Sequence, residues 1–126
     1  MDKVVHFEIP VDDLDRAKAF YRGVFGWQLD DFPGMNYTGI TTCPTGEDRL
    51  PTERGVINGG MTARTDRVTG PVVVVNVASV DDALAQVAAA GGSAVSEKTE
   101  IPQMGWYAYA ADSEGNVIGL WQTMSP

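Results

Sequence analysis

The sequence predicts an α+β fold built from two copies of one βαβββ module, and two observations carry this prediction. First, the two halves of the chain nearly repeat at a spacing of 66 residues, which places Asp15 on Asp81 and Gly26 on Gly92. Second, each half reads in the same order as a strand, a helix-start signal, a helix with one apolar stripe and a glycine stop. A period this long is not that of a short-repeat solenoid, so we expect two modules of one fold.

The first module opens with a strand followed by a helix. Residues 3–9, KVVHFEI, are rich in β-branched side chains, and we expect Pro10 to end the strand because it cannot donate to a ladder. Asp12 or Asp13 then caps a helix that stops at Gly26. The apolar side chains of this helix recur at helical spacing: Ala17, Phe20, Tyr21, Val24 and Phe25.

Three further strands and a long loop complete the first module. Short strands are predicted at residues 27–31 and 36–42, joined by the turn dipeptide Pro33-Gly34. The polar segment 43–55 is expected to be a loop. A strand over 55–64 carries Gly59-Gly60, which indicates a close backbone approach or a bulge.

The second module follows the same order. Residues 71–77, PVVVVNV, predict a strand covered on both faces, and Ser79-x-x-Asp82 resembles a capping box that opens the second helix. The helix is expected to end at Gly91-Gly92. Its apolar stripe consists of Val80, Ala83, Leu84, Val87 and Ala88. Strands are then predicted at 94–98, 105–111 and 116–124, the last two joined by a turn that contains Gly115.

Length, composition and charge exclude several classes of protein. The 126 residues fit one domain, 1–126, with module one at about residues 1–64 and module two at about 71–124. A net charge of −8 without a basic cluster argues against a nucleic-acid partner. No apolar run is long enough for a membrane span and no secretory leader is seen, so we expect a cytoplasmic protein with no membrane partner. The single cysteine, Cys43, is interpreted as an incidental thiol.

Three segments carry a resemblance to a known family: VVHFEIPVDDLDRAKAFYRGVFGW, SVDDALAQVAAAGG and YAYAADSEGNVIGLWQ. Through them the chain resembles the vicinal oxygen chelate superfamily, which includes glyoxalase I, extradiol dioxygenases and bleomycin-resistance proteins. The GLWQ-type strand at residues 119–122 is similar to an uncharacterised glyoxalase-like branch. The resemblance implies two βαβββ modules whose curled mixed sheets form an open barrel around a cavity, and it implies a homodimer.

The superfamily is named for a divalent metal that is held at four positions, which match His6, Asn58, Val72 and Gly119 in this sequence. Only His6 is a strong ligand, because valine and glycine have no donor side chain and the asparagine amide is a weak one. A carboxylate from Glu8 on the same strand face still leaves too few ligands. We therefore expect no metal and no other cofactor.

The residues that remain describe an apolar pocket with a few polar groups. Strand alternation places His6 and Glu8 on one inner face and Tyr107 and Tyr109 together on another, while Gly119 is expected to leave room beside Trp121. The expected ligand-binding residues are His6, Glu8, Asn58, Met104, Trp106, Tyr107, Tyr109 and Trp121. The alternative is that His6 is a core histidine and that the aromatic residues belong to the core.

Two functions from different classes stay open. The first is a metal-free protein that binds a flat or partly cationic small molecule, as the resemblance to bleomycin-resistance proteins implies. The second is a glyoxalase-like lyase or isomerase that acts on a small carbonyl substrate, with His6, Glu8 and Tyr109 in proton transfer. We favour the first, because the sequence contains no visible nucleophile, cofactor fingerprint or oxyanion arrangement.

Overall fold

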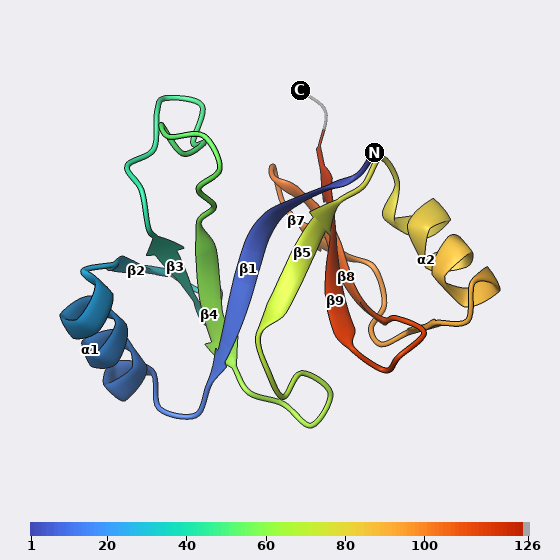
Figure 1. Ribbon diagram of the computed structural model, residues 1–126, viewed down its shortest axis with the longest axis horizontal. Helices are drawn as coiled ribbons and strands as arrows, with labels where there is room; N and C mark the ends of the chain where they lie inside the picture. Colours follow the sequence, from blue (N-terminus) through green and yellow to red (C-terminus); the bar gives the residue numbers. More distant parts are fainter. Residues whose placement is uncertain (125–126) are drawn as a thin grey trace. The chain divides into compact units, whose positions relative to one another are not determined.

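The computed structural model describes residues 1–124, and its contacts divide the chain into two compact units (Figure 1). The first unit is His6–Pro71. The second unit consists of Met1–Val5 together with the chain from Val72 onward. The two units correspond to the two predicted modules, except that the first residues of the chain group with the second one.

The predicted order of elements is confirmed, with one additional strand in the second unit. The elements are β1 (Lys3–Val11), α1 (Leu14–Phe25), β2 (Gln28–Phe32), β3 (Tyr37–Thr41), β4 (Gly59–Ala63), β5 (Val72–Asn76), α2 (Val80–Ala89), β6 (Ser93–Ala94), β7 (Thr99–Ile101), β8 (Gly105–Ala111) and β9 (Val117–Thr123). Within residues 1–124, neither α1 nor α2 has the length or apolarity that a bilayer-crossing helix requires.

The first unit contains a mixed sheet with α1 packed on one face. The strand order is β2-β3-β4-β1, with β1 parallel to β4 and the other neighbours antiparallel. The core lies between this sheet and α1 and is formed by the buried Leu29, Ile40 and Met61. Phe7 and Ile9 of β1 pack against the same core, which defines the α1-facing side of the sheet.

Helix α1 begins and ends where the sequence predicts. Asp13 is the N-cap, and its carboxylate accepts a hydrogen bond from the backbone N–H of Arg16 at 3.0 Å. Gly26 ends the helix in the left-handed conformation, with φ at +71°. Lys18 ties the helix to the sheet through an ion pair with Asp31 at 2.7 Å.

The second unit repeats this arrangement. Its strand order is β5-β9-β8-β6, with β7 also paired to β8 and with β5 parallel to β9. Helix α2 begins at the predicted cap, where the hydroxyl of Ser79 accepts a hydrogen bond from the N–H of Asp82 at 3.1 Å. The core between α2 and the sheet consists of Val77, Val80, Ala108, Ala110 and Leu120.

Three predicted strands differ from the observed ones by more than one residue, and each difference has a local cause. Strand β1 continues past Pro10 to Val11, because its pairing with β4 holds at both residues. Of the strand predicted over 94–98, only Ala94 lies in a strand, β6, and β7 begins at Thr99. The N–H groups of Val95 and Ser96 both donate to the carbonyl of Tyr109 in the manner of a bulge, which interrupts the pairing there.

The third difference is the start of β4, which lies at Gly59 rather than at residue 55. The side-chain oxygen of Asn58 accepts hydrogen bonds from the N–H groups of Thr42 at 2.8 Å and Cys43 at 3.3 Å. Asn58 therefore closes the loop that follows β3.

Candidate functional site

Strand β1 presents a polar side chain pair on the sheet face opposite α1. Phe7 and Ile9 pack into the α1-facing core, so alternation along the strand turns His6 and Glu8 to the other face. All of these residues lie in the first unit. The structure therefore places His6 and Glu8 on one sheet face.

The imidazole of His6 has a close partner on β3. Its Nε2 atom lies 2.6 Å from the hydroxyl oxygen of Tyr37, and the two rings lie nearly parallel, with an interplanar angle of 19°. Tyr37 itself lies beside Phe32 of β2, with 5.8 Å between the ring centroids. A histidine, a tyrosine and an aromatic neighbour are thus gathered over the first sheet.

Two glycines make room for these rings. A Cβ atom at Gly60 would overlap the hydroxyl group of Tyr37, and one at Gly39 would lie 2.8 Å from the ring of Phe32. A Cβ at Gly59 would overlap the carbonyl oxygen of Phe7. The close backbone approach predicted for Gly59-Gly60 is confirmed, and at Gly60 it lets Tyr37 lie across the sheet.

Burial sets the protonation of the pair. Burial lowers the pKa of His6 from its ordinary value of 6.5, which favours a neutral imidazole near pH 7. Burial, and after it the negative charge of Glu8, raises the pKa of Tyr37 above its usual range, so the phenol keeps its proton. The site therefore combines a neutral imidazole, a neutral phenol and the carboxylate of Glu8.

In the second unit, three of the predicted residues share one face of the β8–β9 ribbon. Tyr107 pairs with Trp121 across the strands, and the rings of Tyr107 and Tyr109 are 6.0 Å apart in edge contact. The intervening Ala108 and Ala110 face the α2 core. Tyr107, Tyr109 and Trp121 thus form an aromatic face on the side of the sheet opposite α2.

The expected room beside Trp121 at Gly119 is not there. A Cβ at Gly119 would lie 2.9 Å from Cγ2 of Val74, so the valine side chain fills this space. The indole instead lies over Gly105, where an added Cβ would be 2.8 Å from the ring, and its Nε1 donates to the hydroxyl of Thr123 at 3.1 Å. The parallel pairing of β5 with β9 brings Val74 opposite Gly119 and explains the difference.

The two remaining predicted residues of the second unit lie elsewhere. Trp106 packs against the α2 core, with the ammonium of Lys98 5.6 Å from its ring centroid. Met104 is exposed in the turn between β7 and β8. Neither shares the sheet face of Tyr107.

The residues at the four matched positions do not fit a divalent metal. Nε2 of His6 is engaged by Tyr37, the side-chain oxygen of Asn58 is used by backbone N–H groups, and Val72 and Gly119 offer no donor atom. Within residues 1–124, no three side chains of His, Cys, Asp or Glu gather closely enough to hold a metal ion.

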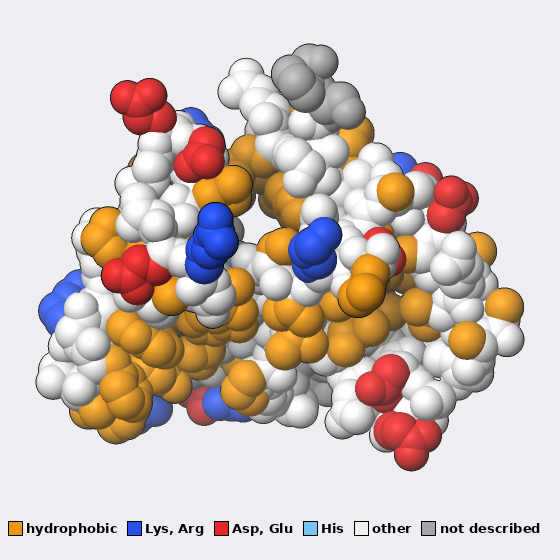
Figure 2. Space-filling model, turned by 45° about the horizontal axis from the view of Figure 1, so that its top comes forward, with side chains coloured by type: hydrophobic (Ala, Val, Ile, Leu, Met, Phe, Trp, Pro, Cys, Tyr) orange, Lys and Arg blue, Asp and Glu red, His pale blue; other side chains and the backbone are white. Residues whose placement is uncertain are grey.

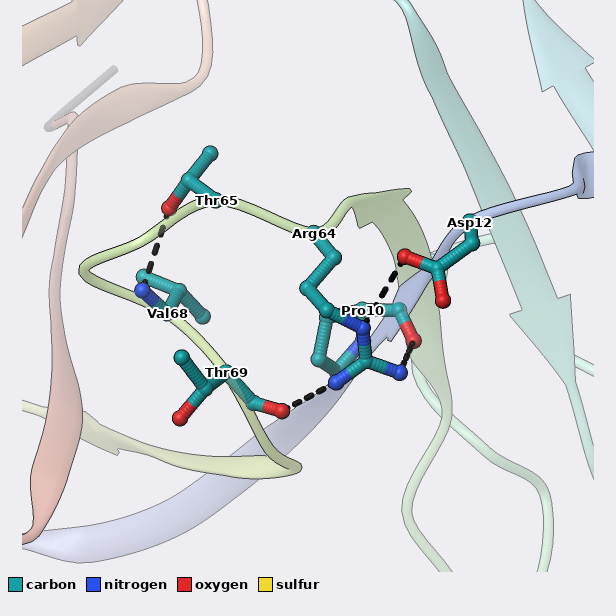
Figure 3. Close-up of polar contacts among 6 residues, drawn as sticks. All are labelled: Pro10, Asp12, Arg64, Thr65, Val68 and Thr69. Carbon is teal, nitrogen blue, oxygen red and sulfur yellow. Dashed lines mark hydrogen bonds and ion pairs between the residues drawn. The ribbon is translucent and has the colours of Figure 1, made fainter.

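A groove of about 310 Å³ lies at the junction of β1 and α1 in the first unit, with Arg64 on its rim. Figure 3 shows how Arg64 is held there. Its Nε donates to the carboxylate of Asp12 at 3.1 Å, while its other nitrogens donate to the carbonyls of Pro10 and Thr69. Because the protein's own groups satisfy this guanidinium, the group around His6 is the better candidate site.

Comparisons of sequence with known proteins give partial matches. The family model described as "Bleomycin resistance protein-like N-terminal" matches residues 3–43. Proteins of Mycobacterium tuberculosis and Mycobacterium bovis, both named "Putative glyoxylase CFP32", are 24% identical over 115 residues, which is 91% of this chain and 43% of theirs. The chain thus spans less than half the length of these curated relatives.

Comparisons of structure show the fold. A hypothetical protein from Bacillus halodurans superposes with a TM-score of 0.64 at 15% identity, covering 99% of this chain and 96% of that one. Methylmalonyl-CoA epimerase from Mycobacterium tuberculosis gives 0.58 at 16% identity, with coverages of 96% and 87%. The epimerase from Streptomyces coelicolor gives 0.62 at 16% identity, with 98% of both chains covered. The predicted α+β fold of curled mixed sheets, of the glyoxalase and bleomycin-resistance type, is confirmed.

Sequence reasoning did not identify Tyr37 as a site residue. It lies 31 positions from His6, and the two meet only because β3 and β1 both flank β4. The signal that pointed to it was Gly60, since a glycine inside a strand indicates that another group approaches closely.

Proposed function

We propose that this chain, which has a fold of the glyoxalase and bleomycin-resistance type, is a metal-independent protein that binds a flat or partly cationic small molecule. The observation that carries the proposal is the group formed by His6, Glu8 and Tyr37 on the face of the first sheet opposite α1. Few polar groups among aromatic side chains are typical of sites for small organic molecules.

The chemistry of this group favours a positively charged or neutral guest. The carboxylate of Glu8 and the net charge of −8 attract cations, and the rings of Tyr37 and Phe32 offer faces for stacking or cation–π contact. The aromatic face of the second unit, with Tyr109 and Trp121, is a further surface on which a flat molecule can stack.

A proton-transfer enzyme acting on a small carbonyl compound is the second candidate. It is favoured by the neutral state of His6, because a neutral imidazole can accept a proton at physiological pH. The name of one sequence match, "Putative glyoxylase CFP32", and that of one structural neighbour, methylmalonyl-CoA epimerase, are names of enzymes and support considering this class. In this candidate His6 and Glu8 act on the substrate, and Tyr37 supports His6.

Thermal unfolding with matched pairs of planar heteroaromatic compounds, one cationic and one neutral in each pair, tests the binding proposal. A ligand at 100 times its Kd stabilises the native state by about 2.7 kcal/mol, so a binding compound should raise Tm measurably, also in the presence of a chelator. Glu8→Gln should weaken the effect of the cationic member most. Asp66→Asn, a change at an exposed carboxylate in the same unit, is the control.

The two candidate functions give different results in this experiment. The binding proposal is wrong if no compound of a broad panel raises Tm while the protein turns over a small carbonyl substrate and His6→Ala abolishes that turnover. That result would support the proton-transfer enzyme. If binding survives in His6→Ala but is lost in Trp121→Ala, the ligand stacks on the second unit and our placement of the site fails.

A further inference from the structure

We infer that Tyr37 is the positioning residue for His6: its hydroxyl donates to Nε2 and holds the imidazole in the tautomer that carries its proton on Nδ1. The inference rests on the proposed function only in treating His6 as a site residue. It concerns the state of the protein before any ligand binds.

The distance favours the hydroxyl as the donor. N–H···O hydrogen bonds usually span about 2.7 to 3.2 Å, whereas hydrogen bonds with a hydroxyl donor are shorter, about 2.5 to 3.0 Å for O–H···O. The separation of 2.6 Å between Oη of Tyr37 and Nε2 of His6 fits an O–H donor and is short for an N–H donor. Nε2 is then the acceptor, and a neutral imidazole that accepts at Nε2 has its proton on Nδ1.

The surroundings keep the phenol in the donating form. Burial and the charge of Glu8 both oppose loss of the proton from Tyr37, and burial opposes gain of a second proton by His6. Both groups are therefore neutral near pH 7, where the phenol can donate and the imidazole can accept a hydrogen bond.

The backbone at Gly60 makes this geometry possible. Any side chain there would occupy the position of the Tyr37 hydroxyl and would displace it from His6. Gly60 pairs with Glu8 across β1 and β4, so the space left by the missing side chain of Gly60 lies directly beside the polar face of β1. Tyr37 therefore supplies the hydrogen-bond donor, and Gly60 leaves the space that the Tyr37 hydroxyl occupies.

The tautomer decides how His6 meets a ligand. With Nε2 engaged, Nδ1 is a hydrogen-bond donor, so a guest that contacts it has to present an acceptor such as a carbonyl oxygen. Glu8 on the same strand face disfavours a negatively charged acceptor. We therefore infer a preference for a neutral carbonyl group, within the class of flat molecules proposed above.

Nitrogen NMR of the ring tests the inference directly, because His6 is the only histidine of the chain. In protein labelled with ¹⁵N-histidine, measured without ligand at pH 8, Nε2 should give the signal of an unprotonated acceptor and Nδ1 that of a protonated nitrogen. In Tyr37→Phe the two signals should move toward one another as the second tautomer becomes populated. Tyr21→Phe, which removes a hydroxyl on the α1 side of the sheet, should leave both signals unchanged.

A protonated Nε2 in the wild type, or signals that do not move in Tyr37→Phe, would overturn the inference. Gly60→Ala should reproduce the effect of Tyr37→Phe, and Gly70→Ala, where a Cβ meets nothing within 4 Å, is its control. If Gly60→Ala does not fold, Tyr37→Phe still decides. The measurement needs no ligand, so its failure is distinguishable from a failure of the binding proposal.

Discussion

At the scale of single residues, the burial of His6 predicts how stability depends on pH. Its pKa in the folded state is lowered from 6.5, so below that pH the unfolded chain takes up a proton that the folded protein resists. The free energy of unfolding should be at its full value above pH 6.5 and should fall as the pH decreases toward the folded pKa of His6. Urea unfolding between pH 7.5 and 5.5 measures this.

In His6→Gln this part of the pH dependence should be absent, because glutamine does not titrate. Tyr37 and Glu8 are the titratable groups that act on this site. Because the pKa of Tyr37 is raised above its usual range, its phenol does not titrate between pH 5.5 and 7.5. A wild-type protein that gains stability as the pH drops from 7.5 to 5.5, with the gain lost in His6→Gln, would show that the folded pKa is raised instead.

The sequence predicted part of this site, and the limit was set by the range of each signal. Alternation along one strand is a local pattern, so it placed His6 and Glu8 on one face correctly. The partner Tyr37 depends on which strands are neighbours, which no local pattern contains. The prediction of space at Gly119 was wrong for the same reason, because Val74, which fills that space, comes from another strand.

At the scale of elements, α1 contains a glycine, Gly23, that lowers the stability of the helix. Gly23 lies in the last turn of the helix, its φ is not positive, and an added Cβ would meet nothing within 4 Å. Glycine inside a helix costs about 0.5–1 kcal/mol relative to alanine. Gly23→Ala should therefore raise the free energy of unfolding by about that amount, measured by urea denaturation.

The matched control is Gly26→Ala three residues later. Gly26 has φ at +71°, which alanine adopts only with strain, so this change should destabilise the protein although no neighbour obstructs its Cβ. Equal effects of the two changes would mean that backbone conformation does not govern these positions.

The helices were the best-predicted elements because single residues at their ends, the N-caps and a terminating glycine, determine where they begin and end. Asp13 and Ser79 cap the two helices where the sequence indicates, and Gly26 ends the first. Strand ends depended on partners instead. The bulge opposite Tyr109 and the loop closed by Asn58 each require contacts between segments that are distant in sequence, so the predicted boundaries there were wrong.

At the scale of the whole molecule, an acidic chain carries an exposed apolar surface on α1. Phe20, Val24 and Phe25 are each more than half exposed. Hydrophobic side chains gather at the lower left of the face in Figure 2, where α1 lies in Figure 1. Apolar surface of this kind often marks an interface, and a two-fold axis lets one patch cover its own copy.

We therefore predict a homodimer that buries the exposed face of α1. Light scattering at micromolar concentration should give twice the chain mass of 13.5 kDa. Because each chain carries a charge of −8, moderate salt should screen the repulsion between copies and favour the dimer. Val24→Glu, which places a charge on the patch without removing a ring contact, should shift the mass toward the monomer, whereas Leu50→Glu, at a loop residue that is 61% exposed, should not. A monomer at these concentrations would refute the dimer, and a dimer that tolerates Val24→Glu would refute this interface.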